Sequence, residues 1–214
     1  MSLYALDSIA DGIRAAFDAQ TAERERALAQ TRKLTRYCAN AIRAIHRGEV
    51  EQARSLLGEA QNLAEALRLN LQPYPPLYFA GYTQDALKEY TEAQTVFALI
   101  FNQPLPTPED LGVEPATYLK GLAEAVGELR RRCLDILRNG YSDEAERLLS
   151  HMDDIYAVLV TIDYPDAITM GLRRLTDIAR SIIERTRGDL TLNLRQQQLE
   201  QALERLEKRL PPEG

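Results

Sequence analysis

Residues 50–71, VEQARSLLGEAQNLAEALRLNL, decide the fold class, because their apolar side chains recur with the period of an α-helix. Proline residues at positions 73, 75 and 76 follow and are expected to end that helix. The same helical spacing runs through nearly the whole chain, and the alternation typical of strands is missing. The sequence therefore predicts an all-α protein. The expected buried stripe of this helix comprises Leu56, Leu57, Leu63, Ala64, Leu67 and Leu71.

Further helices are expected on both sides of this segment. The proline-rich stretch 103–112 is predicted to be a loop, and Ser142 is a candidate helix cap. Short connections favour antiparallel neighbours, so the chain is expected to form a single-domain antiparallel bundle of about seven helices. The predicted helices are 8–47, 50–71, 76–101, 115–139, 142–162, a sixth that stops at Gly188, and the tail.

The C-terminal tail differs from the rest of the chain. Its leucines are spaced by 7, 4, 3 and 4 residues, which is typical of a short heptad seam. We therefore expect residues 1–188 to form the helical domain and residues 189–214 a separate C-terminal helix. The seam could pack on its own domain or pair with another chain. Its members are Leu192, Leu199, Leu203, Leu206 and Leu210.

The chain has 214 residues, and its 26 basic and 32 acidic side chains give a net charge of −6. Taken alone, that charge argues against nucleic-acid binding. The distribution is uneven, however: residues 1–48 carry 8 basic and 5 acidic groups, whereas residues 49–128 carry 4 and 12. Two cysteines favour a reducing, cytoplasmic location. No apolar run is long enough for a bilayer, so no membrane association is expected.

The acidic segment carries a possible metal site. Asp85, Glu89 and Glu92 share one helix face, and the sequence places no basic residue on that face. Glu124 and Glu128 repeat the arrangement on the next long helix. Carboxylates that converge from neighbouring helices suit Mg²⁺ or Mn²⁺. A solvated acidic face is the alternative interpretation.

The basic N-terminal segment carries a stripe of guanidinium groups. Such groups bind phosphate through two parallel hydrogen bonds. A solvated or ion-paired face is again the alternative. The chain lacks a glycine-rich phosphate loop and the usual histidine or cysteine motifs, and its only histidines are His46 and His151. The stripe comprises Arg32, Arg36, Arg43 and Arg47, with Lys33 beside it.

An ordered set of motifs resembles the translin family, and within it the branch of translin-associated factor X. Residues 87–93, LKEYTEA, are similar to that branch's LQEYVEA, and residues 113–122, VEPATYLKGL, to the family's VxPxDYLxGV. Thr117 stands where the family has Asp. Further similarities are Gly127-Glu128-Leu129 with Cys133, Asn139-Gly140, the segment 149–156, and Arg187-Gly188.

The resemblance implies a seven-helix bundle that assembles into a closed, octamer-like barrel, and we expect a homo-oligomer. It also implies Mg²⁺-dependent endoribonuclease activity on single-stranded RNA, with single-stranded RNA or DNA as the partner. By position, Glu89, Glu92 and Asp154 would be catalytic and metal-binding residues, with Glu128 as a fourth. Translin itself lacks the glutamate pair, so this chain resembles the catalytic type. The alternatives are a non-catalytic single-strand-binding oligomer and a helical scaffold with solvated acids.

Overall fold

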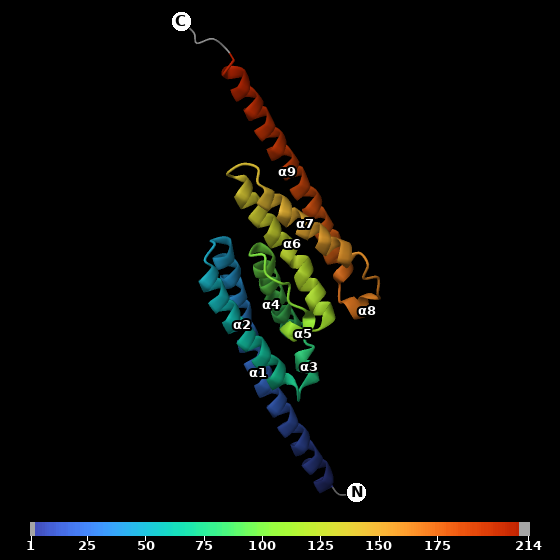
Figure 1. Ribbon diagram of the computed structural model, residues 1–214. Coiled ribbons are helices and arrows are strands. Elements are labelled where there is room, and N and C mark those ends of the chain that lie inside the picture. Colours follow the sequence, from blue (N-terminus) through green and yellow to red (C-terminus); the bar gives the residue numbers. More distant parts are fainter. Residues whose placement is uncertain (1–2, 210–214) are drawn as a thin grey trace. The chain divides into compact units, whose positions relative to one another are not determined.

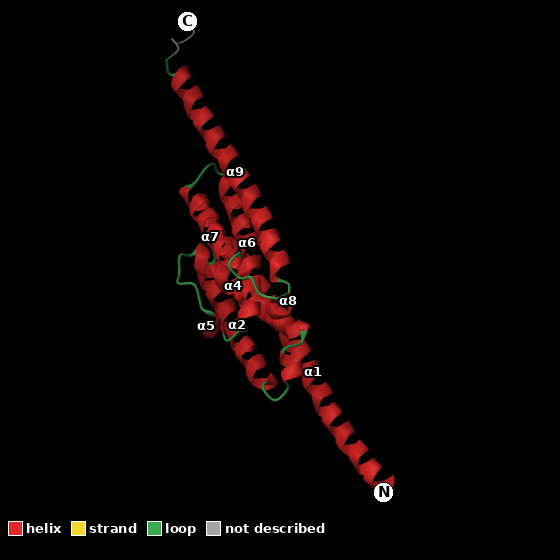
Figure 2. Ribbon diagram, turned by 90° about the vertical axis from the view of Figure 1, so that its right-hand side faces the viewer, coloured by secondary structure: helices red, strands yellow, loops and turns green. Residues whose placement is uncertain are grey.

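A computed structural model describes the chain from residue 3 to residue 209, and over that range it contains nine α-helices and no strand (Figures 1 and 2). The all-helical prediction is confirmed. None of the described helices combines the length and apolar character needed to cross a membrane. The helices are α1 Leu3–His46, α2 Val50–Leu71, α3 Pro75–Tyr78, α4 Gly81–Ile100, α5 Pro108–Leu111, α6 Pro115–Leu137, α7 Asp143–Leu159, α8 Asp166–Thr169 and α9 Leu172–Glu207.

The helices group into two compact units. The first comprises residues 1–94 and 106–117, and the second comprises residues 95–105 and 118–214. Helices α4 and α6 therefore each contribute residues to both units. Three of the nine helices described between residues 3 and 209, namely α3, α5 and α8, are four residues long. The remaining six cover the seven long helices expected from the sequence, because α9 spans both the predicted sixth helix and the tail.

In the first unit, α1 and α2 form an antiparallel hairpin (Figure 1). Gly48 makes the turn with a φ of 74°, a left-handed conformation that glycine adopts without a steric penalty. The bounds predicted for α2 are confirmed, and Leu57, Leu67 and Leu71 of its stripe are buried. Helix α1 begins at Leu3, earlier than the predicted Ser8. Its N-terminal part extends past α2 (Figure 1).

The helix predicted over residues 76–101 is interrupted, because the chain turns at Phe79 and Ala80 between α3 and α4. The Thr83 hydroxyl donates to the Leu77 carbonyl at 2.7 Å, and the Gln84 amide donates to the Tyr78 carbonyl at 2.8 Å. Side chains that bond backbone carbonyls in this way compete with a continuous helix. The proline-rich loop contains the short helix α5, which begins with a capping box between Thr107 and Asp110.

In the second unit, Ser142 caps α7 as predicted, and its hydroxyl accepts a hydrogen bond from the Glu144 backbone N–H. The predicted helix end at Gly188 is wrong, because α9 continues through it to Glu207. Contacts on the C-terminal side explain why. Asp189 pairs with Arg130 at 2.8 Å, and Leu190 is buried. These contacts offset the cost of about 1 kcal/mol that glycine imposes inside a helix.

The C-terminal part of α9 extends past α7 (Figures 1 and 2). The four described leucines of the seam are 50% to 71% exposed. The interpretation that this seam packs on its own domain is therefore wrong for these residues. Leu210, the fifth predicted member, lies outside the described residues. The seam members described are Leu192, Leu199, Leu203 and Leu206.

Candidate nucleic-acid and metal site

The acidic face of α4 brings two of the predicted carboxylates together. An oxygen of Glu89 and an oxygen of Glu92 lie within 4.8 Å of each other. Glu92 is only 9% exposed, whereas Glu89 is partly exposed. The expectation that no basic residue accompanies these acids is wrong, because Lys88 Nζ lies 3.3 Å from a Glu89 oxygen. The lysine precedes Glu89 directly, and its flexible stem lets the ammonium turn back to the carboxylate.

The charge of this pair extends to α1. Cys38 of α1 is fully buried with a free thiol, and the charges of both glutamates act on it. Burial raises the pKa of the Cys38 thiol well above its usual range, and the negative charges of Glu89 and Glu92 raise it further. The thiol is therefore held neutral. The same negative potential that disfavours a thiolate favours a bound cation.

The first unit contains an open pocket of about 400 Å³ between α1 and α4. Arg32 contributes a guanidinium from α1, and Asp85 and Glu89 contribute carboxylates from α4. The pocket therefore offers groups for a phosphate and for a cation within one cavity. The remaining lining residues are Leu28, Thr31, Thr35, Tyr82 and Ala86.

Tyr82, which also lines this pocket, has a buried polar atom without a partner in the described part of the chain. Its ring packs against the cluster of buried apolar residues formed by α1, α2 and α3. Its hydroxyl oxygen is buried and has no hydrogen-bond partner among the described residues. A buried hydroxyl without a partner costs about 1–3 kcal/mol.

The basic stripe on α1 is only partly available for a ligand. Arg32 and Arg36 are exposed and have no ion-pair partner within the described part of the chain. Arg43, in contrast, donates to the Asn40 side chain at 2.9 Å, and Arg47 pairs with Glu49 at 2.6 Å. Lys33 lies over the Tyr37 ring, 5.7 Å from its centre. Arg32 and Arg36 are therefore the members best placed to bind phosphate.

The other two predicted carboxylates belong to the second unit. Glu128 is partly buried on α6 and lies 3.5 Å from Arg131. Asp154 is exposed on α7, and the preceding Asp153 pairs with Arg187 of α9 at 2.6 Å. Of the four predicted carboxylates, the first unit thus contains Glu89 and Glu92 but not Glu128 or Asp154.

Sequence reasoning treated the acidic face and the basic stripe as separate features and did not select Thr31, Thr35 or Tyr82. The two threonines are one turn apart and flank Arg32, which was a usable signal for a polar helix face. Their position opposite Glu89 depends on how α1 packs on α4. No spacing along one helix encodes that packing.

The chain is similar to solved structures over most of its length. It is 37% identical to AfC3PO, a translin-family protein of the archaeal or bacterial type, with a TM-score of 0.80, 86% of this chain and 95% of that chain covered. This chain belongs to the translin family. A relative from Methanocaldococcus jannaschii, the uncharacterized protein MJ0175, is 32% identical over 186 residues, covering 86% of this chain and 82% of that protein. No family model matches the sequence.

Two further structures bear on this translin-family chain. AfC3PO has also been solved as a complex with duplex RNA, with a TM-score of 0.80 and 36% identity over 86% of this chain and 95% of that chain. Apo-NeC3PO is 22% identical with a TM-score of 0.79, covering 86% of this chain and 96% of that chain. The second likeness supports the fold alone.

Proposed function

We propose that this translin-family protein is a Mg²⁺-dependent endoribonuclease that hydrolyses phosphodiester bonds of single-stranded RNA in the cytoplasm. The observation that supports the proposal most strongly is the pocket shared by Arg32 and Glu89. It combines a phosphate-binding group with one member of a carboxylate pair. The complex of the similar AfC3PO with duplex RNA supports RNA as the class of ligand.

Glu89 and Glu92 fit the requirements of a hard cation. Octahedral Mg²⁺ takes oxygen ligands at about 2.0–2.1 Å, so two of its ligands lie up to about 4.2 Å apart. The two glutamate oxygens lie within 4.8 Å of each other, so small rotations of the two side chains bring them to the separation that the ion requires. Mn²⁺ takes the same ligands. When bound, the ion supplies Lewis-acid chemistry that activates water and stabilises the leaving oxygen.

The protein's own groups then have separate tasks. Arg32 binds a phosphate oxygen of the strand, and Arg36, one turn further along α1, binds a neighbouring phosphate. Glu92, nine-tenths buried, holds its carboxylate in a fixed place beside Glu89. On the strength of the family resemblance, Glu128 and Asp154 are proposed as the remaining carboxylates.

The test is a cleavage assay with a short single-stranded RNA and the matching duplex, each with and without Mg²⁺. We expect the protein to cleave the single strand only when Mg²⁺ is present, and we expect a chelator to abolish this cleavage. Salt-dependent binding without metal-dependent turnover would instead establish the alternative, a non-catalytic single-strand-binding protein. The absence of both binding and cleavage would favour the remaining alternative, a helical scaffold with solvated acidic residues.

Replacing Arg32 and Arg36 together with glutamine is expected to weaken RNA binding about equally for all sequences. Each lost phosphate contact lowers the slope of log K against log salt by about 0.7 for a single strand, so the double variant should lose about 1.4. Fluorescence anisotropy over a salt series measures this slope. Arg24→Gln is the matched control, since Arg24 is exposed on the same helix but paired with Glu25. An unchanged slope in the double variant would contradict the proposal that Arg32 and Arg36 bind phosphates.

We also propose that the protein is a homo-oligomer, of the octamer-like kind that the resemblance implies, and that the α9 seam is one of its contacts. Replacing Leu199 and Leu206 with glutamine removes two exposed leucines from the seam. The mass measured by light scattering is expected to fall while the helix content stays unchanged. Gln201→Ala, on the opposite face of α9, should leave the mass as it is. An unchanged mass in the leucine variant would exclude the seam as a contact.

A further inference from the structure

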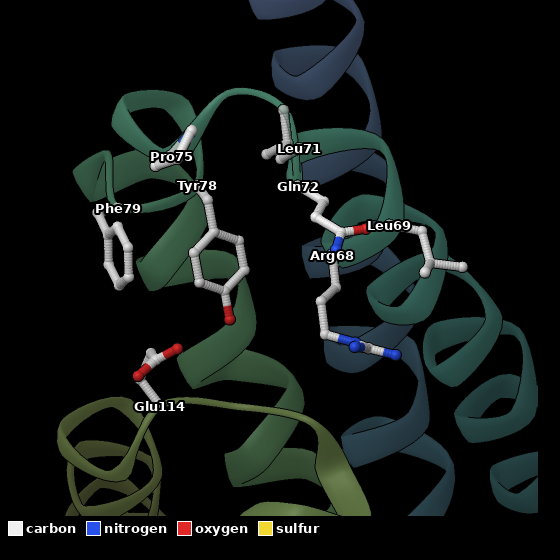
Figure 3. Close-up of a pocket in the computed structure, with 8 residues that line it drawn as sticks. All are labelled: Arg68, Leu69, Leu71, Gln72, Pro75, Tyr78, Phe79 and Glu114. Carbon is white, nitrogen blue, oxygen red and sulfur yellow. The ribbon is translucent and has the colours of Figure 1, made fainter.

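A second pocket of the first unit, of about 290 Å³, lies between α2, α3 and the start of α6 (Figure 3). Its volume is near the lower end for small-molecule sites and fits a ligand with one planar ring system. Tyr78 and Phe79 contribute aromatic rings, with their centres 5.0 Å apart and their planes at 82°. Phe79 is 58% exposed, so its ring is open to a ligand in this pocket.

The pocket also holds opposite charges that do not pair with each other. Figure 3 shows the Tyr78 hydroxyl pointing toward the Glu114 carboxylate, whereas Arg68 lies on the other side of the Tyr78 ring. No ion pair joins Arg68 to Glu114 or to any other residue of the described chain. Burial, and then the charge and hydrogen-bond acceptance of Glu114, raise the pKa of Tyr78. The pocket therefore presents an acceptor, an aromatic face and a cation in sequence.

Neighbouring contacts hold these three groups in place. Gln84 is buried, donates to the Tyr78 carbonyl at 2.8 Å and accepts from the Thr117 hydroxyl at 2.6 Å. It thereby ties Tyr78 to the first turn of α6, which follows Glu114. Gly112 has a φ of 63°, and a side chain at that position would meet the Arg68 Nε at 3.4 Å. The glycine leaves room for the Arg68 stem.

We propose that this pocket binds one unpaired guanine nucleotide of the RNA, with the base on Tyr78, its donor edge on Glu114 and its phosphate on Arg68. Aromatic side chains stack unpaired bases. A carboxylate has two acceptor oxygens, and guanine offers two adjacent donors, N1–H and the N2 amino group. The other bases offer a single donor group on this edge, which favours guanine. Arg68 is exposed at the rim, where a phosphate can reach it.

The inference rests on the proposed function only in taking RNA as the ligand. It adds base selectivity at a place that does not include Glu89 or Glu92. Binding of free nucleotides without Mg²⁺ can therefore test it without any cleavage. Failure of guanine binding would leave the nuclease proposal intact, and failure of cleavage would leave the guanine site intact.

The experiment titrates the full-length protein with GMP, IMP, AMP, CMP and UMP, and with guanosine, by isothermal calorimetry. GMP is expected to bind most tightly. IMP, which lacks the N2 amino group, should bind about tenfold more weakly, since one base contact is lost. Guanosine, which lacks the phosphate, should also bind more weakly than GMP. Equal affinity for all five nucleotides, or no binding of any, would overturn the proposal.

Two variants assign the contacts. Glu114→Gln should weaken GMP binding about 10- to 100-fold and remove the difference between GMP and IMP. Arg68→Gln should remove the difference between GMP and guanosine. Glu109→Gln, an exposed glutamate on α5, is the matched control and should bind GMP like the unaltered protein. Unchanged selectivity in Glu114→Gln would show that GMP binds elsewhere.

Discussion

Glu92→Gln is expected to abolish Mg²⁺-dependent cleavage of single-stranded RNA while the protein still folds and binds RNA. Glutamine keeps the size of the side chain and one oxygen but removes the negative charge that attracts the cation. Because Glu92 is nine-tenths buried beside Glu89, water cannot easily take over its place. Loss of a charged residue that binds the cation should cost at least as much as loss of a residue that only orients such a ligand. We therefore expect a fall in cleavage rate of about 100-fold or more.

The rate is measured at saturating RNA over a series of Mg²⁺ concentrations, so that weakened metal binding and a slower chemical step are separated. Circular dichroism and RNA anisotropy check folding and binding. Glu59→Gln, an exposed glutamate of α2 in the same unit, is the control and should keep full activity. If Glu92→Gln cleaved as fast as the unaltered protein, the metal site would have to be placed elsewhere. A recovery of rate at high Mg²⁺ would identify Glu92 as a ligand that mainly sets affinity.

The same pair shows what sequence can predict about this site. The spacing of Glu89 and Glu92 fixes them on one helix face, because the helical period alone determines it. The ion pair of Lys88 with Glu89 follows from side-chain flexibility, which the period does not describe. The shared pocket of Arg32 and Glu89 requires α1 to pack on α4, a contact between residues far apart in the chain. Local rules therefore identified the groups but not their combination.

Helix ends show the same division between local and distant effects. Leu71 ends α2 as predicted, since the following prolines act on their own backbone. Gly188 does not end α9, because the burial of Leu190 and the pairing of Asp189 with Arg130 stabilise the helix beyond it. A glycine signal is worth about 1 kcal/mol, and a few tertiary contacts outweigh it. Predicted ends are therefore more secure at proline than at glycine.

The largest expected effect on stability is that of Arg147→Met in the second unit. The Arg147 guanidinium donates to the carbonyls of Leu99 and Ile100, at 2.9 and 3.2 Å, and so satisfies the C-terminal end of α4. It also binds both oxygens of Glu144, at 2.7 and 2.8 Å. Its side chain is only 28% exposed, so solvent screens these contacts weakly. Removing them should lower the free energy of unfolding by about 2–3 kcal/mol.

Arg180→Met is the matched control. Arg180 pairs with Glu184 at 3.0 Å, but both side chains are 63% exposed, so its loss should change the free energy of unfolding by less than about 1 kcal/mol. Urea unfolding followed by circular dichroism compares the two variants. Equal small effects would show that Arg147 does not anchor the end of α4.

The pH dependence of the Arg147 effect identifies the Glu144 contact. The hydrogen bonds from Arg147 lower the pKa of Glu144 below its ordinary value of 4.5 in the folded protein. A carboxyl group with a lowered folded-state pKa adds stability that is fully present above its unfolded pKa and is lost as the pH falls through its folded pKa. The difference between the unaltered protein and Arg147→Met should therefore shrink as the pH falls from 6 to below about 4. The part that persists in acid measures the bonds to Leu99 and Ile100, because an arginine remains charged there.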